Sequence, residues 1–410
     1  MRHVIIGTSA AGLKAAETLR AYDPGSAVTL ISDEAHRPYS RPLLTYLLSR
    51  EITPDRLWLR EEDFFARLDL KVRLGEKVIR VDPQAHEVQL ASGKSLPFDR
   101  LLIASGARPR LLDLPGADLE GVFTLRNLAD WQRLDRGLKK EGPVAVVGAG
   151  AVGLKAAEAL ARRGHRVTLL ETASRALPRL LEDEAARLLH QALPELGVEL
   201  HLNTGPVAIL GGKGRVRALT LSDGREIPAA AVLLAVGVAP NLEFLAGAGL
   251  TDAFGLTVNA AMQTGHPDIF AAGDCTRAPH FLSGEPAYYP IWPVAVAGGR
   301  VAGVNMAGGG LTFDGLLPQN SISLKGFHLI TGGLGPGECD DCEVVSEADN
   351  PRGHYRRLVY RQGRLVGLTF VGAVADAGLY FQLMTRQEPV QGSIDPGLLW
   401  GNSGLGGSRF

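Results

Sequence analysis

Three glycines and one acidic residue in the middle of the chain have the types and spacing needed to bind a dinucleotide. Gly148, Gly150 and Gly153 form a G-x-G-x-x-G turn, and Glu171 follows 18 positions after the last glycine. The first glycine permits a tight turn, the second lets a pyrophosphate approach the backbone, and the third allows helix and strand to pack closely. Glu171 would accept a hydrogen bond from a ribose 2′-hydroxyl and repel a 2′-phosphate, which favours NADH over NADPH.

The surrounding elements are those that such a turn requires. An apolar run at 144–147 predicts a buried strand, an Ala- and Leu-rich stretch predicts the following helix, and Gly164 ends that helix before a second strand at 166–170. The helix N-terminus offers free N–H groups and a positive dipole end to phosphate. A glycine triplet alone is weak evidence, but strand, helix and acid together make it specific. The predicted contacts of this turn are Gly148, Gly150, Ala151, Val152 and Gly153.

A second copy of the pattern stands at the start of the chain. Residues 3–6 predict a strand, residues 7–12 a glycine turn, and residues 28–32 a second strand that ends at Asp33. Ser9 replaces the middle glycine, and its small side chain still allows a phosphate to approach. Two such units imply two dinucleotides, and FAD with NADH is the economical pair; the alternative is one functional and one vestigial unit.

Composition restricts the other possibilities. A chain of 410 residues is too long for one core, so two or three domains are expected. A net charge of -1 argues against nucleic acid or an anionic membrane as the main partner. No apolar run reaches the roughly 18 residues of a membrane helix, and the N-terminus enters a strand without a signal peptide. With only three cysteines, the chain is expected to be cytoplasmic.

Three more segments could contact the first dinucleotide. Arg41 follows a proline-stiffened turn, where its guanidinium could bind pyrophosphate in bidentate fashion or simply lie on the surface. Residues 101–109 form an apolar strand that ends in a turn of small residues. Residues 269–275 predict a buried strand that brings Asp274 to a helix start, where it could accept a ribityl hydroxyl or merely cap the helix. Cys275 is expected to pack in that turn.

In these motifs the chain resembles the FAD- and NAD(P)H-dependent pyridine nucleotide oxidoreductases, over roughly residues 2–381. It is most similar to the branch that contains rubredoxin reductase, ferredoxin reductase and the flavoprotein part of NADH-dependent nitrite reductase, and apoptosis-inducing factor shares that layout. The resemblance implies an α/β fold with two Rossmann-like nucleotide-binding domains and a C-terminal α+β cap domain. The implied boundaries are 1–112 with 246–312 for FAD, 113–245 for NAD(H), and 313–410 for the cap.

The resemblance also implies how FAD would be held. The turn at 7–12 and Arg41 would hold the phosphates, Asp33 the adenosine ribose, and Asp274 the ribityl chain. A helix at 294–306 would direct its positive end at the flavin pyrimidine, with Trp292 beside the ring or in the core. The implied FAD contacts are Gly7, Ser9, Ala10, Ala11, Gly12, Asp33, Arg41, Ala104, Ser105, Gly106, Gly273, Asp274, Trp292, Pro293 and Val294. Glu171 and Gly237 complete the NADH set.

The implied reaction passes hydride from NADH to flavin N5 and then electrons to a small redox protein or a partner subunit. Relatives that reduce disulfides, peroxide or oxygen have a cysteine beside the flavin, after the second strand of the first domain. Residues 38–50 contain no cysteine, which argues against thiol chemistry. The alternatives are an NADH oxidase or diaphorase, and a redox-sensing flavoprotein. The acceptor and the oligomeric state, monomer or homodimer, leave no motif in the sequence.

One lysine is the candidate catalytic residue. Ferredoxin-reductase-like relatives often place a Lys near flavin N5 from the segment after the Pro-Arg motif, and a Glu beside it from the glycine-turn helix. Tyr46 and Lys155 occupy these two positions here. We expect Lys155 to supply the positive charge that favours the reduced flavin; the alternative is an ordinary solvated lysine.

The last part of the chain predicts short strands, a helix at 377–385, and a loosely held tail over roughly the last 20 residues. It also contains Cys339-Asp340-Asp341-Cys342, which could be a redox dithiol or half of a zinc site. No second C-x-x-C or close His pair completes a zinc site, so no metal is expected. The acidic pair would disfavour thiolates. A chance local pair, a regulatory disulfide and a metal site remain as alternatives.

Overall fold

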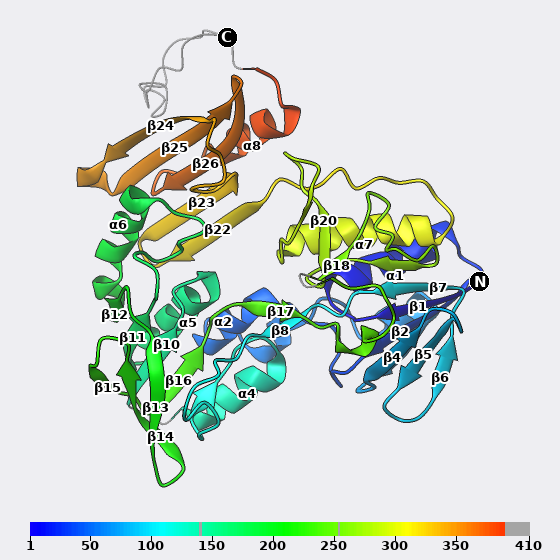
Figure 1. The fold of residues 1–410 in the computed structure, drawn as a ribbon, viewed down its shortest axis with the longest axis horizontal. Helices are drawn as coiled ribbons and strands as arrows, with labels where there is room; N and C mark the ends of the chain where they lie inside the picture. The colour runs from blue at the N-terminus through cyan, green and yellow to red at the C-terminus, as the bar shows by residue number, and fades with distance from the viewer. Residues whose placement is uncertain (139–141, 253–254, 390–410) are drawn as a thin grey trace. The chain divides into compact units, whose positions relative to one another are not determined.

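The computed structural model describes residues 1–138, 142–252 and 255–389, and the predicted C-terminal tail lies outside these residues. Contacts within the chain cluster in two compact units (Figure 1). The first unit comprises Met1–Arg110, Leu125–Trp131 and Gly237–Leu316. The second comprises Leu111–Thr124, Gln132–Val236 and Leu317–Phe410. The predicted three-domain boundaries stay a prediction.

A parallel five-stranded sheet forms the centre of the first unit, in the order β19-β7-β1-β2-β3. Its strands are β1 (Arg2–Ile6), β2 (Ala27–Ser32), β3 (Leu70–Leu74), β7 (Arg100–Ile103) and β19 (Ile269–Ala271). Ile5 of the central strand lies between Leu30 and Leu102, and none of the three is exposed. A strand that is apolar on both sides is typical of a parallel sheet covered on both faces.

Two helices of the first unit, α1 (Ala10–Tyr22) and α7 (Trp292–Met306), pack along each other. Their contact is close because glycines face it: a Cβ on Gly299 would lie 2.3 Å from the Ala11 carbonyl oxygen. The remaining elements of this unit are α2 (Leu44–Leu48), α3 (Phe64–Arg67), β4 (Val78–Asp82), β5 (Glu87–Leu90), β6 (Ser95–Pro97), β8 (Ala107–Pro109), β17 (Val238–Pro240), β18 (Leu256–Thr257), β20 (Thr276–Pro279) and β21 (Pro286–Ala287). The sheet, α1 and α7 together position the glycine turn between β1 and α1.

The second unit repeats the design in its own parallel sheet, ordered β12-β11-β10-β16-β9. The strands are β9 (Val122–Phe123), β10 (Pro143–Val147), β11 (Arg166–Leu170), β12 (Val198–His201) and β16 (Ala231–Leu234). Its other elements are α4 (Leu128–Gly137), of which residues from Gln132 belong here, α5 (Ala151–Arg162), α6 (Asp183–Ala192), β13 (Pro206–Gly212), β14 (Arg215–Leu221) and β15 (Glu226–Pro228). Two Rossmann-like parallel sheets are therefore present, which confirms the predicted fold class.

The second unit also contains an antiparallel sheet near the C-terminus, in the order β22-β23-β26-β25-β24. Its strands are β22 (Gln319–Leu324), β23 (Phe327–Gly333), β24 (Glu343–Asp349), β25 (His354–Arg361) and β26 (Arg364–Val371). Helix α8 (Ala377–Arg386) packs against β23 and β26 (Figure 1). This is the α+β module that the sequence predicts, and we call it the C-terminal domain. Among the described residues, no helix combines the length and apolar character needed to span a membrane.

Candidate functional site

A cleft of about 830 Å³ lies within the first unit. Most of the predicted FAD contacts line it: Gly7, Ser9, Ala10, Ala11, Asp33, Arg41, Ala104, Ser105, Gly106, Gly273, Asp274 and Trp292. Gly12, Pro293 and Val294 do not line it. Because these residues come from at least five separate stretches of the chain, the sheet must bring their chain positions together. A cleft of this size is within the range of sites for cofactors and other small molecules.

The glycine turn after β1 is shaped to receive a phosphate. A Cβ on Gly7 would lie 2.1 Å from the Ala104 carbonyl oxygen, and a Cβ on Gly12 would lie 2.0 Å from the Gly7 carbonyl oxygen. Only glycine fits at both places, so the turn stays tight against β7. Ser9 precedes α1 as its N-cap without a side-chain capping bond, which leaves first-turn N–H groups available to an anion.

Arg41 stands in a polar cluster that the sequence prediction had only partly described. Its guanidinium pairs with the Glu34 carboxylate and reaches the Arg126 carbonyl oxygen at 3.2 Å. The Tyr39 hydroxyl donates to Glu34 at 2.5 Å and accepts from Leu128 N at 2.9 Å. Burial raises the pKa of Tyr39. The cluster fixes Arg41 at the cleft. The sequence prediction missed Tyr39 and Glu34 because no motif contains them.

The small-residue turn after β7 is tied to the segment that follows β17. Ser105 Oγ donates to the Asn241 carbonyl oxygen at 2.7 Å, and Asn241 Nδ2 donates to the Ser105 carbonyl oxygen at 3.0 Å. Strand β17 pairs antiparallel with β8 directly beside this turn. Gly237, predicted on the NADH side, precedes β17, and its carbonyl oxygen accepts from Arg110 N at 2.9 Å.

Asp274 reaches the cleft from the end of β19, but the helix predicted to start there is absent. The chain turns at Gly273, whose φ is +88°, and continues into the short strand β20. Thr276 Oγ1 donates to the Gly273 carbonyl oxygen at 2.7 Å and closes this turn. The prediction of a helix start, and with it the helix-cap alternative for Asp274, was therefore wrong. The carboxylate instead accepts from Arg126 Nη2 at 2.6 Å.

The helix predicted at 294–306 is present as α7, which begins slightly earlier, with Trp292 as its first residue. Pro293 lies in its first turn, and Val294 is buried in the core beside it. Trp292 lines the cleft and packs partly against the core of the first unit. Its predicted place beside the flavin ring stays a prediction. The positive end of α7 thus lies at the cleft, where it can stabilise negative charge.

Tyr288 supplies a buried polar atom without a protein partner near Asp274 and Arg126. Its hydroxyl makes no hydrogen bond to any described residue, and burial raises its pKa to about 12. An unpartnered buried hydroxyl costs free energy unless another group completes it. Together with the phosphate-shaped turn and the acceptor at Asp274, this hydroxyl fits a large polar cofactor such as FAD.

The second glycine turn lies between β10 and α5. A Cβ on Gly153 would lie 1.9 Å from the Gly148 carbonyl oxygen, whereas a Cβ on Gly150 would meet no atom within 4 Å. Gly150 is therefore not needed for packing, and its missing side chain leaves space for a ligand. Ala151 and Val152 are exposed in the first turn of α5. A Cβ on Gly148 would lie 2.5 Å from the Ala235 carbonyl oxygen, so Gly148 and Gly153 are required by packing and Gly150 is the open position.

Glu171 follows β11 and binds the same turn. One carboxylate oxygen accepts from Ala149 N at 2.9 Å, and the other accepts from Ala173 N at 2.9 Å. These bonds hold the negative charge at the carboxyl end of the sheet, beside the glycines. Such a position suits recognition of a ribose diol and opposes a 2′-phosphate.

Lys155 lies on α5 and is held within the second unit. Its Nζ donates to Glu158 Oε2 at 2.6 Å and to the Ser323 carbonyl oxygen at 2.7 Å. The Glu158 side chain is only 4% exposed, and its other oxygen accepts from Lys325 N at 2.8 Å. Lys155 is thus not an ordinary solvated lysine, because it joins α5 to the hairpin of β22 and β23. Its predicted catalytic role stays a prediction.

Cys275 packs in its turn as expected. It is fully buried, with Sγ 3.5 Å from the carbonyl oxygens of Ile103 and Ala272. Burial raises the pKa of its thiol to about 11. A thiol that is neutral and inaccessible cannot act as a nucleophile.

Comparison with known proteins agrees with this geometry. A curated relative, the NADH-dependent phenylglyoxylate dehydrogenase subunit epsilon of Aromatoleum evansii, is 32% identical over 94% of this chain and 92% of its own. Rubredoxin-NAD(+) reductase of Pseudomonas putida is 31% identical over 89% and 94%. The reductase in the solved covalent putidaredoxin reductase-putidaredoxin complex superposes with a TM-score of 0.90 at 27% identity, over 98% of this chain and 96% of that one.

The family model for the pyridine nucleotide-disulphide oxidoreductases matches residues 1–299. That span includes both glycine turns, the Arg41 cluster and Asp274, so the family model covers the residues of the candidate site. The chain therefore belongs to the pyridine nucleotide-disulphide oxidoreductase family, whose members are oxidoreductases that use FAD and a pyridine nucleotide.

Proposed function

We propose that this protein oxidises NADH at a bound FAD and delivers the electrons to a small redox protein of the rubredoxin or ferredoxin type. The observation that supports this most directly is a cleft without a thiol. The described residues that line it include no cysteine, and the nearby Cys275 is fully buried, which raises the pKa of its thiol. Reduction of a disulfide substrate through a flavin-side thiol therefore has no candidate nucleophile in this cleft.

The relatives support the same direction of electron flow. The Pseudomonas protein is named for rubredoxin, and the solved complex pairs its reductase with putidaredoxin. Both names describe a carrier protein as the electron acceptor. A chain that aligns with such reductases over nearly its whole length is a candidate for the same class of acceptor.

The residues of this chain would bind and orient the cofactor. The turn of Gly7 and Gly12 and the N-terminus of α1 would hold the pyrophosphate. Arg41 would pair with the negative charge of the pyrophosphate, and Asp274 would accept from a ribityl hydroxyl. The N-terminus of α7 would stabilise negative charge on the isoalloxazine. When bound, the flavin supplies the hydride-accepting and electron-releasing chemistry.

The preference for NADH over NADPH is the finer part of the proposal. Glu171 is fixed by two backbone N–H groups beside the glycine turn. Its negative charge would repel a 2′-phosphate and accept from a 2′-hydroxyl. The low cysteine count favours a reducing compartment such as the cytoplasm.

A second candidate is the NADH-accepting subunit of a larger dehydrogenase. The relative from Aromatoleum evansii is named as a subunit and aligns over 94% of this chain. In that case the acceptor would be a cofactor of a partner subunit rather than a diffusing carrier. The chain alone would then be a monomer or homodimer that turns over slowly with free carriers.

Steady-state oxidation of NADH by the FAD-loaded protein tests the proposal. We expect turnover with rubredoxin or a ferredoxin at least about tenfold faster than with oxygen alone, because no thiol near the flavin activates oxygen chemistry. Turnover with oxygen that equals turnover with every carrier would reject it in favour of an oxidase. Slow turnover with all free acceptors, together with co-purification of other subunits, would favour the second candidate.

A further inference from the structure

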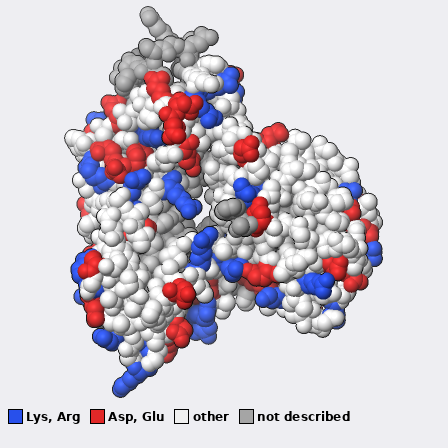
Figure 2. Space-filling view, in the orientation of Figure 1, with Lys and Arg blue, Asp and Glu red and all other residues white. Residues whose placement is uncertain are grey.

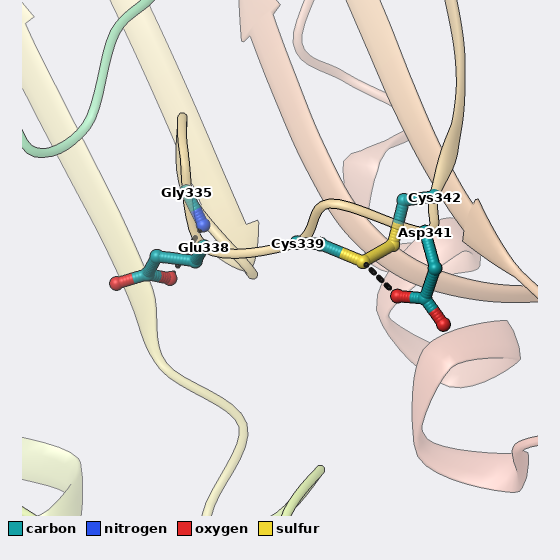
Figure 3. Close-up of a disulfide and its surroundings, with 5 residues drawn as sticks. All are labelled: Gly335, Glu338, Cys339, Asp341 and Cys342. Atoms are coloured by element: carbon teal, nitrogen blue, oxygen red, sulfur yellow. Dashed lines mark hydrogen bonds between the residues drawn. A yellow bond between two sulfur atoms is a disulfide. The ribbon is translucent and has the colours of Figure 1, made fainter.

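The C-terminal domain contains a cysteine pair that the proposed reaction does not use. Cys339 and Cys342 form a disulfide in the loop between β23 and β24, with their Cα atoms 5.6 Å apart (Figure 3). Both cysteines are partly exposed, and Asp340 and Asp341 between them are exposed. The third cysteine of the chain, Cys275, is buried in the first unit. Solvent thiols can therefore reach this pair and no other cysteine.

The fold holds this loop without needing the disulfide. Leu334 N donates to the Val366 carbonyl oxygen at 2.8 Å where the loop begins, and Gly335 N donates to Glu338 Oε2 at 2.7 Å within it (Figure 3). Strand β24 pairs with β25 along its whole length directly after Cys342. A bond between residues three positions apart also restricts the unfolded chain less than a disulfide that closes a long loop. Opening the disulfide should leave the sheet intact.

Asp341 contacts Cys339 in a way that distinguishes the two redox states. Its Oδ1 lies 3.3 Å from Cys339 Sγ (Figure 3). A disulfide sulfur has no proton, so this contact places a carboxylate against a sulfur lone pair. A reduced Cys339 has an S–H group, which can donate to the same oxygen without any movement of the loop. The contact therefore offers reduced Cys339 a hydrogen-bond acceptor that the disulfide cannot use.

Acidic side chains surround the pair. Glu338, Asp340, Asp341 and Glu343 are all exposed, and Asp and Glu side chains gather on the visible face of the C-terminal domain (Figure 2). Their charge repels an approaching anionic thiol and attracts one that has a positive charge nearby. This charge would favour a partner whose thiol lies in positively charged surroundings.

We propose that Cys339 and Cys342 form a redox-active site that exchanges electrons with a thiol of positively charged surroundings while the protein stays folded. A thiolate attacks one sulfur, forms a mixed disulfide and releases the other cysteine, which takes up a proton. A second thiol of the partner displaces the first bond, so two electrons and two protons pass to the protein and the partner becomes a disulfide. A small disulfide reverses the sequence.

Thiol exchange on the native, FAD-loaded protein tests this site. The protein is incubated with cysteamine, 2-mercaptoethanol or glutathione, which are cationic, neutral and anionic thiols, and free thiols are counted by alkylation and peptide mass. We expect two new thiols in the 339–342 peptide, reoxidation by cystamine, and an unchanged circular dichroism spectrum. Cysteamine should react about tenfold faster than glutathione at low ionic strength, with the difference shrinking at high salt.

Two variants separate the contact from the charge. Asp341→Asn should shift the thiol–disulfide equilibrium towards the disulfide by about threefold to tenfold, because the S–H acceptor loses its charge. Asp340→Asn removes the same charge from the neighbouring position and should shift the equilibrium less. Equal shifts in both variants would overturn the role of Asp341.

Three results would overturn the proposal itself. The disulfide could resist reduction by every thiol until the protein unfolds, or the reduced cysteines could fail to be reoxidised by cystamine. The reduced pair could also bind Zn²⁺ stoichiometrically in a complex that blocks exchange. The site is independent of the proposed function. Cys339→Ser and Cys342→Ser should abolish exchange and leave NADH oxidation with rubredoxin or ferredoxin unchanged, so the two proposals can fail separately.

Discussion

Arg126 Nη2 donates to Asp274 Oδ2 at 2.6 Å, and this bond joins two segments 148 positions apart at one cleft. The side chains are 23% and 16% exposed. Arg126 is itself fixed, because its Nε donates to the Ala107 carbonyl oxygen and its backbone N donates to Asp130. The carboxylate of Asp274 is therefore positioned by the protein before any cofactor arrives, with one oxygen left to accept from a ligand.

Replacement of that carboxylate should weaken FAD binding. Asp274→Ala removes an acceptor whose hydrogen bonds, being charged, are each worth about 1.5–3 kcal/mol, so we expect the FAD dissociation constant to rise roughly tenfold to hundredfold. Equilibrium dialysis of the apoprotein with FAD measures it. The control is Asp99→Ala, which breaks an exposed pair with Arg2 away from the cleft. An unchanged affinity in Asp274→Ala would exclude this residue as a flavin ligand.

The glycines of the second turn should respond differently to the same added methyl group. Gly153→Ala places a Cβ 1.9 Å from the Gly148 carbonyl oxygen, so the strand and helix must separate and the melting temperature should fall by several degrees. Gly150→Ala meets no protein atom within 4 Å at a φ of -74°. Its stability should be unchanged, while the KM for NADH rises about tenfold because the methyl occupies the pyrophosphate space.

Thermal melts and steady-state kinetics on the two variants decide this. Gly25→Ala is the matched control, because its Cβ also meets nothing within 4 Å and lies far along the chain from the turn. If Gly150→Ala bound NADH as tightly as the unmodified protein, the pyrophosphate would not lie on this turn.

Glu171 should set the preference between the two nicotinamide cofactors. Glu171→Gln keeps the size of the side chain and removes its charge, so both the attraction for the 2′-hydroxyl and the repulsion of a 2′-phosphate weaken. The ratio of kcat/KM for NADH over NADPH should fall roughly tenfold to hundredfold. Glu199→Gln, an exposed acid on the adjacent strand β12, should leave the ratio unchanged. A ratio that stays constant in Glu171→Gln would place the ribose elsewhere.

Lys155 allows a structural role to be separated from an electrostatic one. Lys155→Met leaves the buried Glu158 carboxylate without its ammonium partner, and we expect a loss of about 3–5 kcal/mol in the free energy of unfolding. The double variant Lys155→Met with Glu158→Gln removes the unpaired charge and should recover much of that loss. If Lys155 also acts electrostatically on the flavin, stopped-flow reduction of the flavin by NADH should be slower in both variants than in the unmodified protein. If the double variant recovered the rate of flavin reduction together with its stability, Lys155 would serve only to join α5 to the β22–β23 hairpin.

The local patterns predicted the elements well where the signal lay within a few residues. The spacing of Gly148, Gly150 and Gly153 predicted a strand, a turn and a helix, which are β10 and α5. The short strands predicted for the last part of the chain are likewise present in the C-terminal domain. These predictions succeed because a glycine turn and an apolar strand are fixed by their own residues.

Contacts between distant segments could not be predicted in the same way. Arg126 falls within residues 113–245, which were predicted to bind NAD(H), yet it binds Asp274 because the fold places residues 125–131 in the first unit. The error about a helix after Asp274 has a related cause. The buried strand and Gly273 were recognised, but the side-chain bond from Thr276 that turns the chain into β20 has no periodic pattern.

Stability should depend on pH through a histidine in β1. His3 is 1% exposed, neither ring nitrogen has a hydrogen bond to a described residue, and Nε2 lies 3.5 Å from Asp23 Oδ2. Burial lowers the pKa of His3 from 6.5, and Asp23 opposes this only in part. The unfolded chain therefore binds a proton at a higher pH than the folded chain. The stability contribution is complete above about pH 6.5 and is lost as the pH falls below it.

Chemical denaturation at a series of pH values between 7.5 and 5 tests this. The free energy of unfolding should fall with decreasing pH, by at most about 1.4 kcal/mol per pH unit for one proton. His3→Leu cannot titrate, so its profile should be flatter, whereas His328→Leu at an exposed position of β23 should keep the original slope. Burial also lowers the pKa of His165 and His190, so some slope should remain in His3→Leu. A profile of His3→Leu that matched the unmodified protein would show that protonation of β1 does not limit stability in acid.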